Sequence, residues 1–123
     1  MSQRVSTNII MVIGADLHFC YLMRRYVRES AHPLLFAGPD EKALELAQHQ
    51  KPAMIILEAG LMDTKGQHMI KTLKMNQNTN RIPIVMCSWH DEGVDRVEEG
   101  ADVYLRMPIL YGDFLDTINH LGI

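Results

Sequence analysis

The stretch Pro52-Ala53-Met54-Ile55-Ile56-Leu57-Glu58 decides the fold of this chain. Its apolar residues do not alternate with polar ones, so residues 53–58 are predicted to form a strand that is covered on both faces. The strand ends in a carboxylate, Glu58. Open α/β sheets gather their functional groups at the carboxyl ends of their strands. Residue 58 is therefore the first candidate for a functional site.

Four other short apolar segments share this character, and they are residues 8–13, 33–37, 82–88 and 101–105. Helix candidates alternate with the strands and cover residues 17–28, 40–50, 67–75, 91–99 and 110–121. Residues 58–66 are expected to form a loop. This alternation predicts an α/β fold with a five-stranded parallel sheet and helices on both faces.

The length and composition fit one globular domain. The chain has 123 residues, of which 47% are hydrophobic and 22% charged. We expect a flexible N-terminus at residues 1–7 and one domain over residues 8–123. The net charge of −3 gives no electrostatic basis for binding nucleic acid or an anionic membrane. No apolar stretch approaches the length of a membrane span, and no signal peptide is visible.

The cysteines and histidines give no support for a metal site. Cys20 and Cys87 lie in apolar surroundings, far apart in the sequence, and are expected to be reduced thiols of a cytoplasmic protein. No two of the six histidines lie three or four residues apart, and no CxxC motif occurs. Phosphate-binding glycine loops of the GxGxxG and Walker types are also absent from the sequence.

Five pieces of the sequence occur in a specific order and spacing: Ala43-Leu44 in residues 37–44, the strand that ends at Glu58, Gly66, the strand 82–88 that ends at Ser88, and residues 100–108 with Tyr104 and Pro108. Together they resemble the receiver domains of bacterial two-component response regulators. The similarity covers nearly the whole chain. It implies the flavodoxin-like (βα)5 fold and a role in phosphorelay signal transduction.

The resemblance also implies a phosphorylation site, and the sequence departs from it at most positions. Receiver domains hold Mg²⁺ with an acidic pair after the first strand, and here that pair is replaced by Gly14 and Ala15. The phosphate-accepting aspartate is replaced by Glu58, and the lysine that offsets the phosphoryl charge is replaced by Met107. The hydroxyl residue remains as Ser88. We therefore expect the chain to lack Mg²⁺, any other metal or cofactor, and a catalytic residue.

Two interpretations of Glu58 stay open. Its carboxylate is either a permanent, partial mimic of a phosphoryl group that reaches toward Ser88, or a surface carboxylate bonded to water or Lys65. Asp16 follows the altered pair and is interpreted as a helix cap in preference to a metal ligand.

Two aromatic residues near the site, Tyr104 and Trp89, are also interpreted in two ways. Tyr104 holds the place of the aromatic switch, and the alternative is a fixed, half-buried ring. Trp89 is either an exposed partner anchor or a side chain packed on the fourth helix. The Met107–Pro108 bond is expected to be cis, as in the family.

The fourth helix is expected to be shortened. The interval between Ser88 and Gly100 is about one helical turn of 3.6 residues shorter than the family's. Gly93 in its middle disfavours helix by about 1 kcal/mol relative to alanine.

These departures favour a pseudo-receiver, which is a signalling domain that works without phosphorylation. Its partner would be a protein such as a kinase, an output domain or another receiver, and the oligomeric state stays open. One alternative is a flavodoxin-like domain that binds a small molecule in the room vacated at Gly14 and Ala15. A second is a working phosphorelay receiver that uses Glu58 as the acceptor.

Overall fold

The computed structural model describes residues 8–58, 64–89 and 100–123. Two expectations lie outside these residues. They are the flexible N-terminus at 1–7 and the shortened helix at 91–99, which is the family's fourth helix and not the helix labelled α4 below. The described part of the chain holds five strands and four helices.

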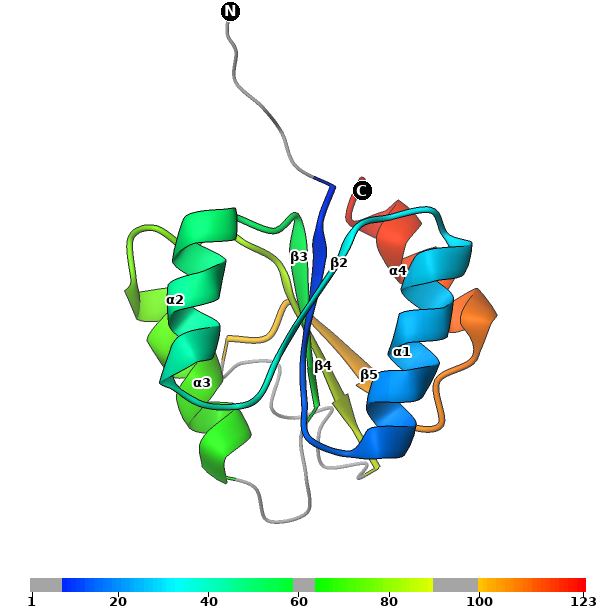
Figure 1. The fold of residues 1–123 in the computed structure, drawn as a ribbon, viewed down its shortest axis with the longest axis horizontal. Coiled ribbons are helices and arrows are strands. Elements are labelled where there is room, and N and C mark those ends of the chain that lie inside the picture. Colours follow the sequence, from blue (N-terminus) through cyan, green and yellow to red (C-terminus); the bar gives the residue numbers. More distant parts are fainter. Residues whose placement is uncertain (1–7, 59–63, 90–99) are drawn as a thin grey trace, which may run out of the picture.

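The strands form one parallel sheet in the order β2-β1-β3-β4-β5, which confirms the predicted fold class (Figure 1). Their bounds are β1 (Ile10–Ile13), β2 (Leu34–Ala37), β3 (Met54–Glu58), β4 (Ile84–Ser88) and β5 (Val103–Arg106). Every residue of β1 and β4 is buried, and so is β3 up to Glu58, which is half-buried. The continuous apolar runs thus become the central strands of a sheet that is covered on both faces.

Of the four helices that the structure describes, two lie on each face of the sheet (Figure 1). The first face carries α1 (Leu17–Glu29) and α4 (Tyr111–His120), and the second carries α2 (Glu41–Gln50) and α3 (Thr64–Met75). Alternate residues of each strand serve the two cores, because successive side chains point to opposite faces. In β3, Met54 and Ile56 pack with α1 and α4, whereas Ile55 and Leu57 pack with α2 and α3.

The expected loop over residues 58–66 is too long. Helix α3 begins at Thr64, so Gly66 lies in its first turn. The first N–H groups of a helix have no acceptor within the helix, so a glycine there costs less than one in the interior. Strand β4 starts at Ile84 and not at residue 82, because Pro83 has no N–H to donate to the ladder. Strand β5 likewise starts later, at Val103, and extends through Arg106.

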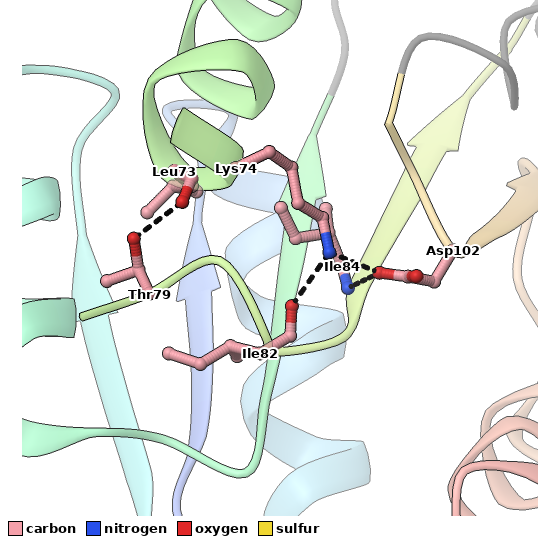
Figure 2. Close-up of polar contacts among 6 residues, drawn as sticks. All are labelled: Leu73, Lys74, Thr79, Ile82, Ile84 and Asp102. Carbon is pink, nitrogen blue, oxygen red and sulfur yellow. Dashed lines mark hydrogen bonds and ion pairs between the residues drawn. The ribbon is translucent and has the colours of Figure 1, made fainter. Parts of the chain in front are cut away.

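Polar contacts join α3 to the amino ends of β4 and β5, as Figure 2 shows. Oδ2 of Asp102 accepts hydrogen bonds from Nζ of Lys74 at 2.9 Å and from the backbone nitrogen of Ile84 at 2.8 Å. Nζ of Lys74 also donates to the carbonyl of Ile82 at 3.2 Å. The buried hydroxyl of Thr79 donates to the carbonyl of Leu73 at 2.6 Å. These contacts fix the edge of the sheet opposite to the candidate site.

Candidate functional site

The residues that replace the family's phosphorylation site meet at the carboxyl edge of the sheet. Glu58 ends the central strand β3, and Gly14 directly follows the neighbouring strand β1. Ile13 pairs with Leu57, so Gly14 and Glu58 stand next to each other across the two strands. On the other side of β3, Glu58 pairs with Cys87 of β4.

The Glu58 carboxylate binds the backbone of the turn between β1 and α1. Its Oε1 atom accepts hydrogen bonds from the backbone nitrogens of Ala15, at 2.8 Å, and of Asp16, at 3.1 Å. Neither interpretation of Glu58 from the sequence included this contact. The strand's alternation accounts for it, because residues 54, 56 and 58 point to the face that carries α1.

Gly14 leaves the space that this carboxylate fills. A Cβ atom at residue 14 would lie 2.8 Å from Oε1 of Glu58 and 3.1 Å from two ring carbons of Phe19. The first distance is shorter than real Cβ contacts, so a side chain here would displace the carboxylate. The Glu58 carboxylate and the Phe19 ring therefore lie close to the position where the sequence suggested vacated room for a ligand.

Asp16 caps α1, as the sequence predicts. Its Oδ2 atom accepts a hydrogen bond from the backbone nitrogen of Phe19 at 2.8 Å, and its own backbone is extended. The cap satisfies one of the N–H groups that a helix start leaves without an acceptor.

The hydroxyl and lysine positions of the family lie on β4 and just after β5. Ser88 is 3% exposed, and its carbonyl accepts a hydrogen bond from the backbone nitrogen of Met107 at 2.7 Å. Met107 itself is buried in the core under α1 and α4, which an ammonium group would not tolerate without a partner. The Met107–Pro108 peptide bond is cis, as the resemblance implies.

The two aromatic residues of the site differ in exposure. Tyr104 is half-buried and packs against the core under α2 and α3, which agrees with the interpretation of a half-buried ring. Trp89 is 59% exposed beside the buried Ser88. The fourth helix, on which the alternative would pack Trp89, falls on residues 91–99 outside the described part of the chain.

Both cysteines are free thiols near the Glu58 carboxylate. Burial raises the pKa of the Cys87 thiol, and the negative charge of Glu58 raises it further. The pKa of Cys20 on α1 is also raised, first by burial and then by the carboxylates of Glu58 and Asp16. The site therefore disfavours thiolates and holds the thiols in their neutral form.

The residues at this edge do not fit the Mg²⁺ ion that the fold family implies. Gly14 and Ala15 have no side-chain oxygen, and one oxygen each of Glu58 and Asp16 already accepts a backbone N–H. The N–H groups of Ala15 and Asp16 direct their positive ends into the same space, which favours an anion and repels a cation. Residues 8–58, 64–89 and 100–123 hold no group of three or more His, Cys, Asp or Glu that could bind a metal ion.

None of the helices that the structure describes combines the length and the apolar character needed to cross a membrane.

Comparison with known proteins supports the resemblance seen in the sequence. No family model matches the chain. The transcriptional regulatory protein PhoP of alkaline phosphatase synthesis, from Bacillus subtilis, is 30% identical over 102 residues, which are 80% of this chain but only 42% of PhoP. The polar-differentiation response regulator DivK of Brucella ovis is 25% identical over 122 residues, which are 94% of this chain and 98% of DivK.

A solved structure shows the same fold. It is the receiver domain of a sensor histidine kinase from Pseudomonas aeruginosa, with magnesium coordinated in its active-site cleft. The TM-score is 0.82 at 15% identity, over 96% of this chain and 100% of that one. These matches are to a transcriptional regulatory protein, a response regulator and a receiver domain, so the resemblance to response-regulator receiver domains is confirmed.

Proposed function

Because the chain is a receiver domain of the response-regulator kind, we propose that it signals through protein–protein contacts and without phosphorylation. In this role it is a binding module and not an enzyme. The partner is a protein such as a kinase, an output domain or another receiver, met in the cytoplasm. The observation that carries this proposal is the pair of hydrogen bonds between Glu58 and the turn after β1.

Those hydrogen bonds engage one of the two oxygens of the carboxylate that would have to react. A phosphate acceptor needs a free carboxylate oxygen in line with the phosphoryl donor and a metal ion that offsets the charge. Oε1 of Glu58 is held by Ala15 and Asp16, and the side chains of residues 14 and 15 supply no ligand oxygen.

The family's lysine position offers no positive charge either. A phosphoryl group brings between about −1.5 and −2 charges at neutral pH. The family's lysine would offset that charge, but Met107 is apolar and buried here. A phosphoryl group on residue 58 would also add negative charge near Asp16, whose backbone nitrogen lies 3.1 Å from Oε1.

The two alternatives have less support. A small molecule in the space at Gly14 would have to displace Glu58 and Phe19, which line it at 2.8 and 3.1 Å from the Cβ position. A phosphorelay through Glu58 would have to proceed without the family's acidic pair and lysine, because those positions are Gly14, Ala15 and Met107 here. None of the contacts described for residues 8–58, 64–89 and 100–123 favours either alternative.

The proposal is tested with beryllofluoride or acetyl phosphate in the presence of Mg²⁺. Trp89 is the single tryptophan of the chain and follows Ser88 directly, so its fluorescence reports on the site. We expect no saturable, Mg²⁺-dependent change. A Trp89→Phe variant measures the background, and a receiver domain with the complete acidic set is the positive control. A saturable response that requires Mg²⁺ would overturn the proposal.

A further inference from the structure

We infer that Glu58 is a positioning residue whose carboxylate fixes the turn between β1 and α1, and that Gly14 is present to make room for it. In this domain the residue at the acceptor position would then act on the N-terminal end of α1. This inference and the proposed function both rest on the hydrogen bonds to Glu58. NMR and urea unfolding measure those bonds, whereas the Mg²⁺-dependent response measures phosphorylation, so the two failures can be told apart.

The hydrogen bonds define what Glu58 holds. Ala15 and Asp16 are consecutive residues immediately before Leu17, where α1 begins. Their N–H groups both point at Oε1 of Glu58, at 2.8 and 3.1 Å. A single oxygen thus fixes two successive peptide groups of the turn.

The helix provides an electrostatic reason for this arrangement. Negative charge is favourable near a helix N-terminus, and the first turn of α1 contains no acidic residue of its own. Asp16 supplies one carboxylate as the cap, and Glu58 supplies a second one from a strand 42 residues away in sequence. Glu58 therefore joins the end of β3 to the start of α1.

Side-chain alternation sets the direction in which residue 58 acts. Glu58 continues the face of Met54 and Ile56, which is covered by α1 and α4. Ser88 continues the face of Ile84 and Met86, which is covered by α2 and α3 and also carries Tyr104. The permanent charge at residue 58 is therefore directed toward α1, whereas the two switch positions follow the opposite face of the sheet.

Gly14 is the second half of the arrangement. Even a methyl group at residue 14 would approach Oε1 of Glu58 to 2.8 Å. Removing the carboxylate relieves this contact, although the ring carbons of Phe19 at 3.1 Å remain. Residues 14 and 58 should therefore be energetically coupled, because a side chain at residue 14 would displace the carboxylate of residue 58.

The direction of action is tested by NMR of the intact chain. Backbone amide shifts are compared between the wild type, Glu58→Gln and Glu58→Ala, with Glu45→Gln as the matched control on the exposed face of α2. We expect the amide protons of Ala15 and Asp16 to move upfield, slightly in Glu58→Gln and strongly in Glu58→Ala, with no such change in the control. Unchanged amides at residues 15 and 16, or largest changes at Ser88 and Tyr104, would overturn the inference.

The coupling is tested by a double-mutant cycle in urea. Gly14→Ala is measured in the wild type and in Glu58→Ala. In the wild type we expect it to lower the folding equilibrium constant by about tenfold, since it breaks hydrogen bonds to a charged group. In Glu58→Ala its effect should be at least about threefold smaller, as expected for residues in contact. If Gly14→Ala changed the folding equilibrium constant equally in both backgrounds, Gly14 would not be needed to accommodate the Glu58 carboxylate.

Discussion

Nζ of Lys74 lies 2.9 Å from Oδ2 of Asp102, and this ion pair ties α3 to the residue that leads into β5. The same oxygen accepts the backbone N–H of Ile84, so one carboxylate serves two elements of the fold. The side chains of Lys74 and Asp102 are 23% and 43% exposed, so water screens the pair only in part.

Lys74→Met should lower the free energy of unfolding by about 1 kcal/mol, and Asp102→Ala by about 2 kcal/mol, because the latter also leaves the Ile84 N–H without its acceptor. Urea denaturation measures both. The control is Arg25→Met, which breaks the exposed pair with Glu29 at 3.4 Å and should cost at most about 0.5 kcal/mol. Equal costs for Lys74→Met and Arg25→Met would contradict a structural role for the Lys74–Asp102 pair.

The Asp16 cap should contribute measurably to stability. Asp16→Ala removes the acceptor for the Phe19 N–H, and we expect the free energy of unfolding to fall by about 1 kcal/mol. Asp16→Ser keeps a capping oxygen and should recover most of the loss. Asp116→Ala, at an exposed residue of α4, serves as the control. If Asp16→Ser were as unstable as Asp16→Ala, the side chain would not act as a cap.

The Tyr26 hydroxyl joins α1 to the segment before α4. It donates to the carbonyl of Ile109 at 2.8 Å, while its ring packs on Tyr111 and Phe114. Tyr26→Phe keeps the ring and loses the hydrogen bond, so we expect a cost of about 1 kcal/mol in thermal or urea unfolding. Tyr21→Phe on the same helix is the matched control, because Tyr21 is 62% exposed. A cost equal to that of the control would argue against the hydrogen bond.

The buried thiol of Cys87 should make the domain less stable at alkaline pH. Burial, and secondarily the charge of Glu58, raise its pKa in the folded state, whereas an unfolded cysteine has a pKa of about 8.5. Below about pH 8.5 both states keep the proton, so this contribution to stability is fully present. Above it the unfolded state alone loses the proton, and stability falls as the pH rises toward the folded pKa.

Unfolding free energies at about pH 7.5 and pH 9.5, in a reducing buffer, measure this effect. The decline should be smaller in Cys87→Ala, even though that variant is less stable at both pH values. An identical decline in the two proteins would assign the alkaline loss to other groups.

The sheet could be predicted from the sequence because burial of apolar side chains is the dominant reason that its central strands form. Residues such as Ile55 and Ile56 are apolar on both sides of the strand, and only a sheet covered on both faces buries both. The start of α3 was predicted less well. The loop was predicted to extend through Gly66, although a glycine is tolerated within a first helical turn that begins at Thr64.

The site was predicted by position but not by contact. Residues 14, 15 and 58 were identified as altered, yet the hydrogen bonds from Ala15 and Asp16 to Glu58 depend on β1 lying beside β3, which no local pattern encodes. One sequence signal pointed that way. The two-residue period of Met54, Ile56 and Glu58 places the carboxylate on the same face as the apolar residues that α1 covers.

The central claim is that the carboxyl edge of the sheet cannot accept a phosphoryl group, and intact-mass spectrometry tests it most directly. The domain is incubated with acetyl phosphate and Mg²⁺ beside a receiver domain that retains the acidic pair, the aspartate and the lysine. We predict that the control gains the mass of one phosphoryl group and that this domain keeps its unmodified mass. A phosphoryl adduct that depends on Mg²⁺ and disappears in Glu58→Gln would contradict the claim.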